Sequence, residues 1–161
     1  MSADRLKVFV CTRLDDELCR LVTELEPRVD LVVDQSLLPP MRWPGDHEGD
    51  PSFARTPEQQ ARFEQLCDSA EALYGIPDTK PAQLARTVRA NPRLRWVHTM
   101  AAGGGSQVRA SGLSAEERAQ GFVLETLVGP FLETSLEEMA QLFNVMNDAP
   151  RGDLDMEDEK T

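Results

Sequence analysis

The sequence predicts an α/β domain built on a parallel sheet of about five strands. Short runs of β-forming residues alternate with segments that carry helical apolar stripes. The connections between these runs are long enough to hold a helix, as parallel pairing requires. A chain of 161 residues with 40% hydrophobic and 28% charged residues suits one domain with a substantial core.

The chain opens with a β-α-β pattern. Residues 6–11 (Leu-Lys-Val-Phe-Val-Cys) and 29–33 are rich in strand formers. Between them, Asp15 or Asp16 is a suitable helix cap, and Pro27 ends the helix. The helix carries an apolar stripe at helical spacing, formed by Leu18, Leu21, Val22 and Leu25.

Residues 35–55 cannot form regular structure, because 37–51 hold four prolines and two glycines. A long irregular segment inside a small domain is typically a functional loop or a disordered one. Large apolar residues favour an ordered flap: Leu38, Met41 and Trp43. His47 has acidic neighbours, but the cluster lacks the spacing of a known metal-ligand set, and we expect it to be solvated.

The second half continues the alternation. Thr56 and Pro57 are a good helix start, with a capping side chain followed by proline at the first helical position. The remaining expected elements are strands at 72–76, 94–99 and 122–124, a helix at 81–88, and single helical turns at 107–110 and 113–118. This order predicts a flavodoxin-like three-layer domain over residues 1–126.

Two further segments follow this domain. Residues 127–147 contain a helix with a broad apolar face, and 148–161 are acidic and poor in core formers, as in a disordered tail. The helix either folds back onto its own sheet or pairs with a second copy. We expect a homodimer, because helices for both sheet faces are already provided by the earlier elements.

Charge and composition limit the partners and the compartment. A formal net charge of −11 argues against nucleic acid or an anionic membrane as partner. The sequence shows neither a signal-peptide pattern nor an apolar run long enough to span a bilayer. Three cysteines without a pairing framework fit a reducing compartment and small buried side chains. We therefore expect a cytoplasmic protein.

The strand at 94–99 runs directly into the glycine-rich stretch 101–105, and His98 stands at its end. In open α/β sheets ligands bind beyond such strand ends. Glycines allow a ligand to approach the backbone closely, although the same residues also suit a plain tight turn. His98 is equally open to two interpretations, a ligand contact or a hydrogen bond within the sheet edge.

Several segments together resemble the N-terminal, substrate-binding domain of D-isomer-specific 2-hydroxyacid dehydrogenases. The resemblance extends from the first strand to about Glu125. It rests on Trp43-Pro44-Gly45-Asp46-His47, Ala72-Leu73-Tyr74-Gly75-Ile76-Pro77, Leu94-Arg95-Trp96-Val97, Ala101-Ala102-Gly103-Gly104-Gly105 and Gln107-Val108. The most specific part is the run from Leu94 to Val108.

The resemblance implies a site for a small 2-hydroxy or 2-keto acid. Backbone amides of Ala102, Gly103, Gly104 and Gly105 would meet the carboxylate, as convergent N–H donors suit such a group. Tyr74, Gly75 and Ile76 would line the same cleft, and we place His98 beside them. No metal site is expected.

In this family the catalytic arginine, glutamate and histidine lie on a second domain, which binds NAD or NADP. The chain ends before any match to that domain, and it has no G-x-G-x-x-G fingerprint. We therefore expect a truncated dehydrogenase-like chain with neither catalytic residues nor a cofactor of its own. A stand-alone carboxylate-binding or regulatory module and a non-functional remnant are the alternatives.

The purified chain should not bind NADH, because both the fingerprint and the ribose-binding acid that follows it are missing. Titration of the chain into NADH, followed by nucleotide fluorescence or heat, tests this expectation. Saturable binding with micromolar affinity would contradict it.

Overall fold

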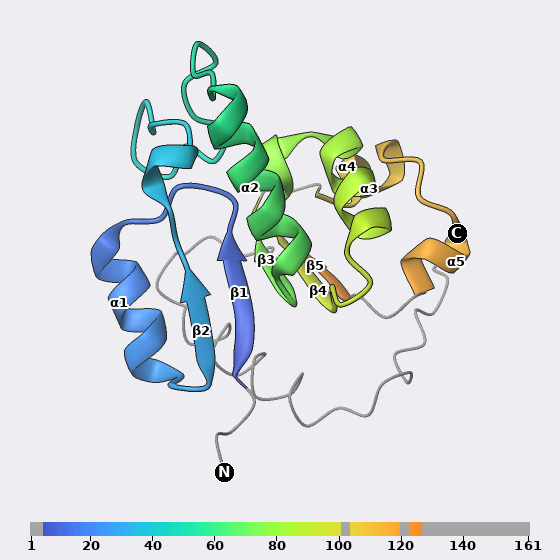
Figure 1. Cartoon of the computed structure of the whole chain (residues 1–161), viewed down its shortest axis with the longest axis horizontal. Helices are drawn as coiled ribbons and strands as arrows, with labels where there is room; N and C mark the ends of the chain where they lie inside the picture. The colour runs from blue at the N-terminus through green and yellow to red at the C-terminus, as the bar shows by residue number, and fades with distance from the viewer. Residues whose placement is uncertain (1–4, 101–103, 120–122, 127–161) are drawn as a thin grey trace.

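The computed structural model describes residues 5–100, 104–119 and 123–126 (Figure 1). Its strands are β1 (Leu6–Val10), β2 (Val29–Val32), β3 (Ala72–Tyr74), β4 (Trp96–Thr99) and β5 (Val123–Thr126). Its α-helices are α1 (Asp16–Leu25), α2 (Pro57–Ser69), α3 (Pro81–Ala90), α4 (Gly104–Ala110) and α5 (Ala115–Ala119). Two short 3₁₀ helices, η1 (Gln35–Leu37) and η2 (Pro77–Thr79), complete the described elements.

The strands form one sheet in the order β2-β1-β3-β4-β5, and every neighbouring pair is parallel. The predicted α/β class is confirmed, and this strand order is that of flavodoxin-like folds. Right-handed crossovers in this order place α1 on one face of the sheet and α2 and α3 on the other. Contacts of α3 with both α2 and α4 agree with that arrangement.

The core lies along the middle of the sheet. Phe9, Leu73, Trp96 and Val97 are fully buried on three neighbouring strands. The ring of Phe9 meets that of Phe63 on α2 edge-on, with 5.6 Å between centroids. Burial of each such side chain stabilises the fold by roughly 1.5–3 kcal/mol. The contact between Phe9 and Phe63 joins the sheet to α2.

Local signals located most helix ends correctly. The side chain of Thr56 accepts from the Gln59 backbone N–H while Gln59 returns a bond to the Thr56 backbone, which is the expected start of α2. At α1, by contrast, Asp15 occupies the cap position without a capping side-chain bond. The region expected to form a terminal helix and tail, 127–161, lies outside the described residues.

The glycine-rich segment differs from its prediction. The helix expected at 107–110 begins three residues earlier, so Gly104 and Gly105 belong to α4 and not to a loop. Gly105 does not have the positive φ that would demand glycine. The loop interpretation is therefore wrong for these two positions.

Within the described ranges, no helix combines the length and apolar content that crossing a bilayer would need.

Gly75→Ala should destabilise the fold more than Gly112→Ala. Both glycines have positive φ, +94° and +68°, so both alanines carry a backbone cost of about 1–2 kcal/mol. Only at residue 75 would the new Cβ lie 3.0 Å from Thr12 Cγ2 and 3.2 Å from Thr12 Cβ, whereas at residue 112 it meets nothing within 4 Å. We expect an additional loss of about 1–3 kcal/mol in urea unfolding. An equal loss of unfolding free energy in the two variants would show that the Thr12 side chain moves aside without cost.

Candidate functional site

A pocket of about 510 Å³ opens at the carboxyl ends of β1 and β3. The strand order reverses at this point, with β2 on one side of β1 and β3 on the other, and such switch points are the usual ligand sites of open α/β sheets. Three segments form most of its lining: residues 11–13 after β1, part of the loop 39–55, and residues 78–80 before α3, to which Gln60 on α2 and Gln83 on α3 are added. The loop predicted to be an ordered flap thus forms a wall of the pocket.

Asp46 organises the loop wall. Its carboxylate is buried and accepts bonds from the Arg42 guanidinium at 2.7 and 3.0 Å, and from the backbone N–H groups of Arg42, Glu48 and Gly49. The Arg42 side chain, and then these backbone donors, hold the pKa of Asp46 well below its usual range. This carboxylate is committed to the loop. Among the described residues, no group of three or more potential metal ligands exists.

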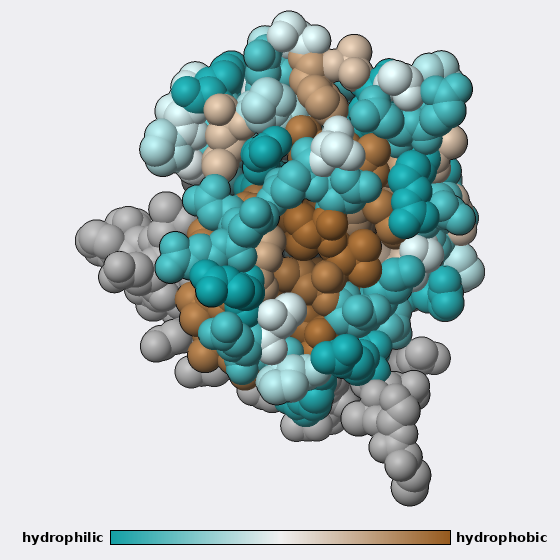
Figure 2. All heavy atoms as spheres, turned by 60° about the vertical axis from the view of Figure 1, so that its left-hand side comes forward, coloured by the Kyte–Doolittle hydropathy of each residue, from teal (hydrophilic) through white to brown (hydrophobic). Residues whose placement is uncertain are grey.

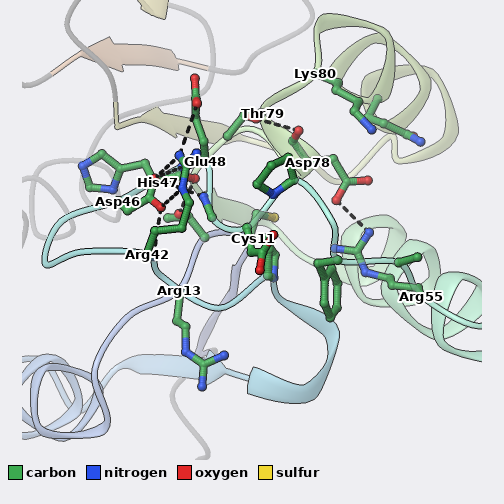
Figure 3. A pocket seen from close by; sticks show the side chains of 18 of the residues that line it. Cys11, Arg13, Arg42, Asp46, His47, Glu48, Arg55, Asp78, Thr79 and Lys80 are labelled. Atoms are coloured by element: carbon green, nitrogen blue, oxygen red, sulfur yellow. Dashed lines mark hydrogen bonds and ion pairs between the residues drawn. The ribbon is translucent and has the colours of Figure 1, made fainter.

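A second ion pair lies on the other side of the pocket in Figure 3. The buried Arg55 guanidinium is 2.7 Å from Asp78, and it also donates to the Leu37 carbonyl. Asp78 and its neighbour Thr79 both have positive φ, +54° and +50°. A β-branched residue rarely adopts this conformation, so the Arg55 pair and the bonds around it hold a strained turn against the pocket.

Two cations face the pocket without an ion pair in the part of the chain that the structure describes: Arg13, half-buried, and Lys80, exposed. Arg42 and Arg55 are neutralised by Asp46 and Asp78. Arg13 and Lys80 are thus side chains that could bind an anionic group, but Glu48 and Asp50 also line the pocket and balance their charge.

The site residues predicted from sequence lie beside this pocket, at the end of β3, and one strand further, on β4. Tyr74, Gly75 and Ile76 follow or end β3 and are buried, and His98 is buried on β4. None of them lines the pocket, but Gly75 packs against Thr12, which does.

The fold brings the predicted residues of β3 and β4 together. Tyr74 is the register partner of His98, their rings are 5.6 Å apart, and the Gly75 N–H donates to the His98 carbonyl at 2.9 Å. Gly104 and Gly105 begin α4 after the same strand. Ala102 and Gly103 lie outside the described residues.

His98 is held as a neutral imidazole between aromatic rings. Its ring lies 5.5 Å from that of Trp96, and Nδ1 is buried without a hydrogen-bond partner among the described residues. Burial, with a smaller contribution from His47, lowers the pKa of His98 to about 4. At neutral pH it can exchange a hydrogen bond with a ligand but supplies no positive charge.

The cysteines offer no reactive group here. Cys11 lines the pocket, but burial and the neighbouring Cys67 raise the pKa of its thiol well above the usual value. The protonated thiol is a poor nucleophile and a poor metal ligand. Cys11 and Cys67 are free and buried as predicted, whereas Cys19 is only half-buried.

The β1–α1 connection does not fit a dinucleotide. Such a turn uses glycines and the positive end of a helix to hold a pyrophosphate. Here the turn contains no glycine, and Asp15, Asp16 and Glu17 place three carboxylates at the start of α1. These charges would repel a pyrophosphate.

Sequence reasoning missed Arg13, Asp78, Thr79 and Lys80. The available signal was their position, since each follows a predicted strand by a few residues and carboxyl ends of parallel strands share one edge. Comparison with protein-family models, curated proteins and solved structures found no match to this chain.

The pKa of His98 predicts a pH-dependent stability. An unfolded histidine titrates near pH 6.5, so below that pH the unfolded chain takes up a proton that the folded chain resists until about pH 4. This site therefore lowers the stability as the pH falls from about 6.5 to about 4, by roughly 3 kcal/mol in total. His98→Phe should flatten the curve in this window when unfolding by urea is measured at several pH values. A wild-type slope that persists in the variant would contradict the assignment.

Proposed function

We propose that this chain is the substrate-binding domain of a D-2-hydroxyacid dehydrogenase-like oxidoreductase. In this proposal it holds a small 2-hydroxy or 2-keto acid at the carboxyl edge of its sheet. The observation that carries the proposal is the meeting of two strand ends there, where the Gly75 N–H bonds to the His98 carbonyl. Both segments that resemble the family's substrate cleft thus leave the sheet side by side.

The surroundings of Gly105 support a backbone contact with the acid. A Cβ added at this residue would have no heavy atom of the described residues within 4 Å, so this side of the backbone faces open space. Glycine at an exposed helical position lowers stability by about 0.5–1 kcal/mol relative to alanine. Neither a positive φ nor close packing requires glycine at residue 105. Close approach of a ligand to the backbone would explain why glycine stands there.

Two further features suit a hydroxy or keto acid. The first is the neutral imidazole of His98, which stands at the end of β4 beside Gly75 and adds no negative charge to the edge that the acid would occupy. The second is the pair Arg13 and Lys80, which lie at the same edge of the sheet and can each donate hydrogen bonds to a carboxylate, with Glu48 and Asp50 balancing their charge.

In the proposed reaction a nicotinamide cofactor, NAD or NADP, provides the hydride chemistry. The β1–α1 turn fits a dinucleotide poorly, so we assign no cofactor contact to it. The role left to the chain is to bind and orient the acid.

Gly105→Val should weaken binding of pyruvate, a simple 2-keto acid, by at least about tenfold. The valine side chain would occupy the open space beside the backbone, where an added Cβ meets no described heavy atom within 4 Å. Binding is measured by calorimetry or by chemical-shift changes, and thermal unfolding checks that the fold is unchanged.

Ala110→Val is the matched control, because it places the same β-branched residue at an exposed position at the other end of α4. The control should bind pyruvate as the wild type does. Equal pyruvate affinity of the wild type and both variants would show that the glycine segment does not bind the carboxylate. Failure of the wild type to bind pyruvate would contradict the proposal as a whole.

A further inference from the structure

We infer that the free edge of β2 is the contact surface for a second copy of this chain, which adds its own β2 in antiparallel orientation. Within the described part of the chain, β2 stands at the end of the sheet order and pairs with β1 alone. One row of its backbone groups is therefore left for another strand, and a second copy would continue the sheet across a two-fold axis.

The direction of the free backbone groups follows from one hydrogen bond. The Leu6 N–H donates to the Arg28 carbonyl at 2.9 Å, so the groups of residue 28 face β1. Directions alternate along a strand, so Asp30 and Val32 also face β1, whereas Leu31 and Val33 face outward. Among the described residues, no bond outside the sheet uses the N–H or carbonyl of Leu31 or Val33.

The edge is also apolar. Leu31, Val32 and Val33 are only half-buried, and Leu25 at the end of α1 is 48% exposed. Figure 2, which brings the side of α1 and β2 forward, shows a hydrophobic area enclosed by hydrophilic side chains. Asp30 is the single charged residue within β2, and neither the lysine nor the proline that commonly protects an edge is present there.

One antiparallel register pairs three of the four outward-facing groups of Leu31 and Val33 and leaves the Val33 carbonyl to solvent. With Leu31 opposite Leu31 of the second copy, the two residues exchange both of their N–H···O bonds. Val33 then lies opposite Val29 of the second copy and donates to its carbonyl. The Val29 N–H is already bonded to the Glu26 carbonyl at 3.0 Å, so it needs no partner across the axis.

The same register is complementary in charge. Arg28 falls opposite Asp34 of the second copy, and the two-fold axis repeats this pair. The Arg28 side chain binds Glu26 within its own chain and is 39% exposed. Asp30 falls opposite Val32 and diagonal to Asp30 of the second copy, so the two negative charges are not directly opposed. A single sequence thus supplies both sides of the contact, and this favours a second copy as the occupant.

Sedimentation velocity on the full chain tests the inference at physiological salt, where repulsion between two chains of net charge −11 is screened. We expect a concentration-dependent dimer below about 100 µM. Leu31→Lys should weaken it by at least about tenfold, because two lysines meet on the axis. Ala90→Lys adds the same charge at the exposed end of α3, over the opposite part of the sheet, and should dimerise like the wild type.

Amide hydrogen exchange on the wild type tests the register without any substitution. The N–H groups of Leu31 and Val33 should become slow to exchange as the dimer forms. A monomer at every concentration would overturn the inference. A dimer in which these two amides stay fast, as one formed through residues 127–147 would be, would overturn it as well, and so would a folded Leu31→Lys protein that dimerises normally.

Discussion

The parallel pairing of β1 on both of its sides is the constraint on which the rest of the structure depends. Val8, Phe9 and Val10 are almost completely buried between β2 and β3. The pairing continues past the end of β1, where the Cys11 N–H donates to the Tyr74 carbonyl at 2.8 Å. The connection after β1 passes to one face of the sheet and the connection after β3 passes to the other. The two segments therefore separate, and a pocket opens between them.

The irregular loop keeps its shape through polar contacts and not through a core of its own. The buried carboxylate of Asp46 gathers Arg42 and two further backbone donors, and the hydroxyl of Thr12 donates to the His47 carbonyl at 3.1 Å. A buried charge is tolerated only when its hydrogen bonds are satisfied. The loop is therefore ordered around one buried carboxylate whose hydrogen-bond donors come from the protein itself. That arrangement fixes one wall of the pocket relative to β1.

The two proposals concern separate parts of the molecule and can be judged independently. The acid site would lie at the carboxyl ends of β3 and β4, near Gly75, His98 and Gly105, while the dimer contact would use the outer edge of β2. These surfaces share no residue. A ligand experiment therefore does not depend on the state of association, and the two-fold contact would leave both copies of the pocket open at their strand ends.

The sequence by itself determined the kinds and the order of the elements, because apolar periodicity and caps such as Thr56 act over one or two helical turns. It also predicted that the loop 35–55 is irregular but ordered, and it placed Tyr74 and His98 at strand ends. Only the tertiary structure decided that Arg55 pairs with Asp78, that Gly75 packs on Thr12, and that α4 already begins at Gly104. These contacts depend on which strands become neighbours, and strand order is set by long-range packing that no local pattern encodes.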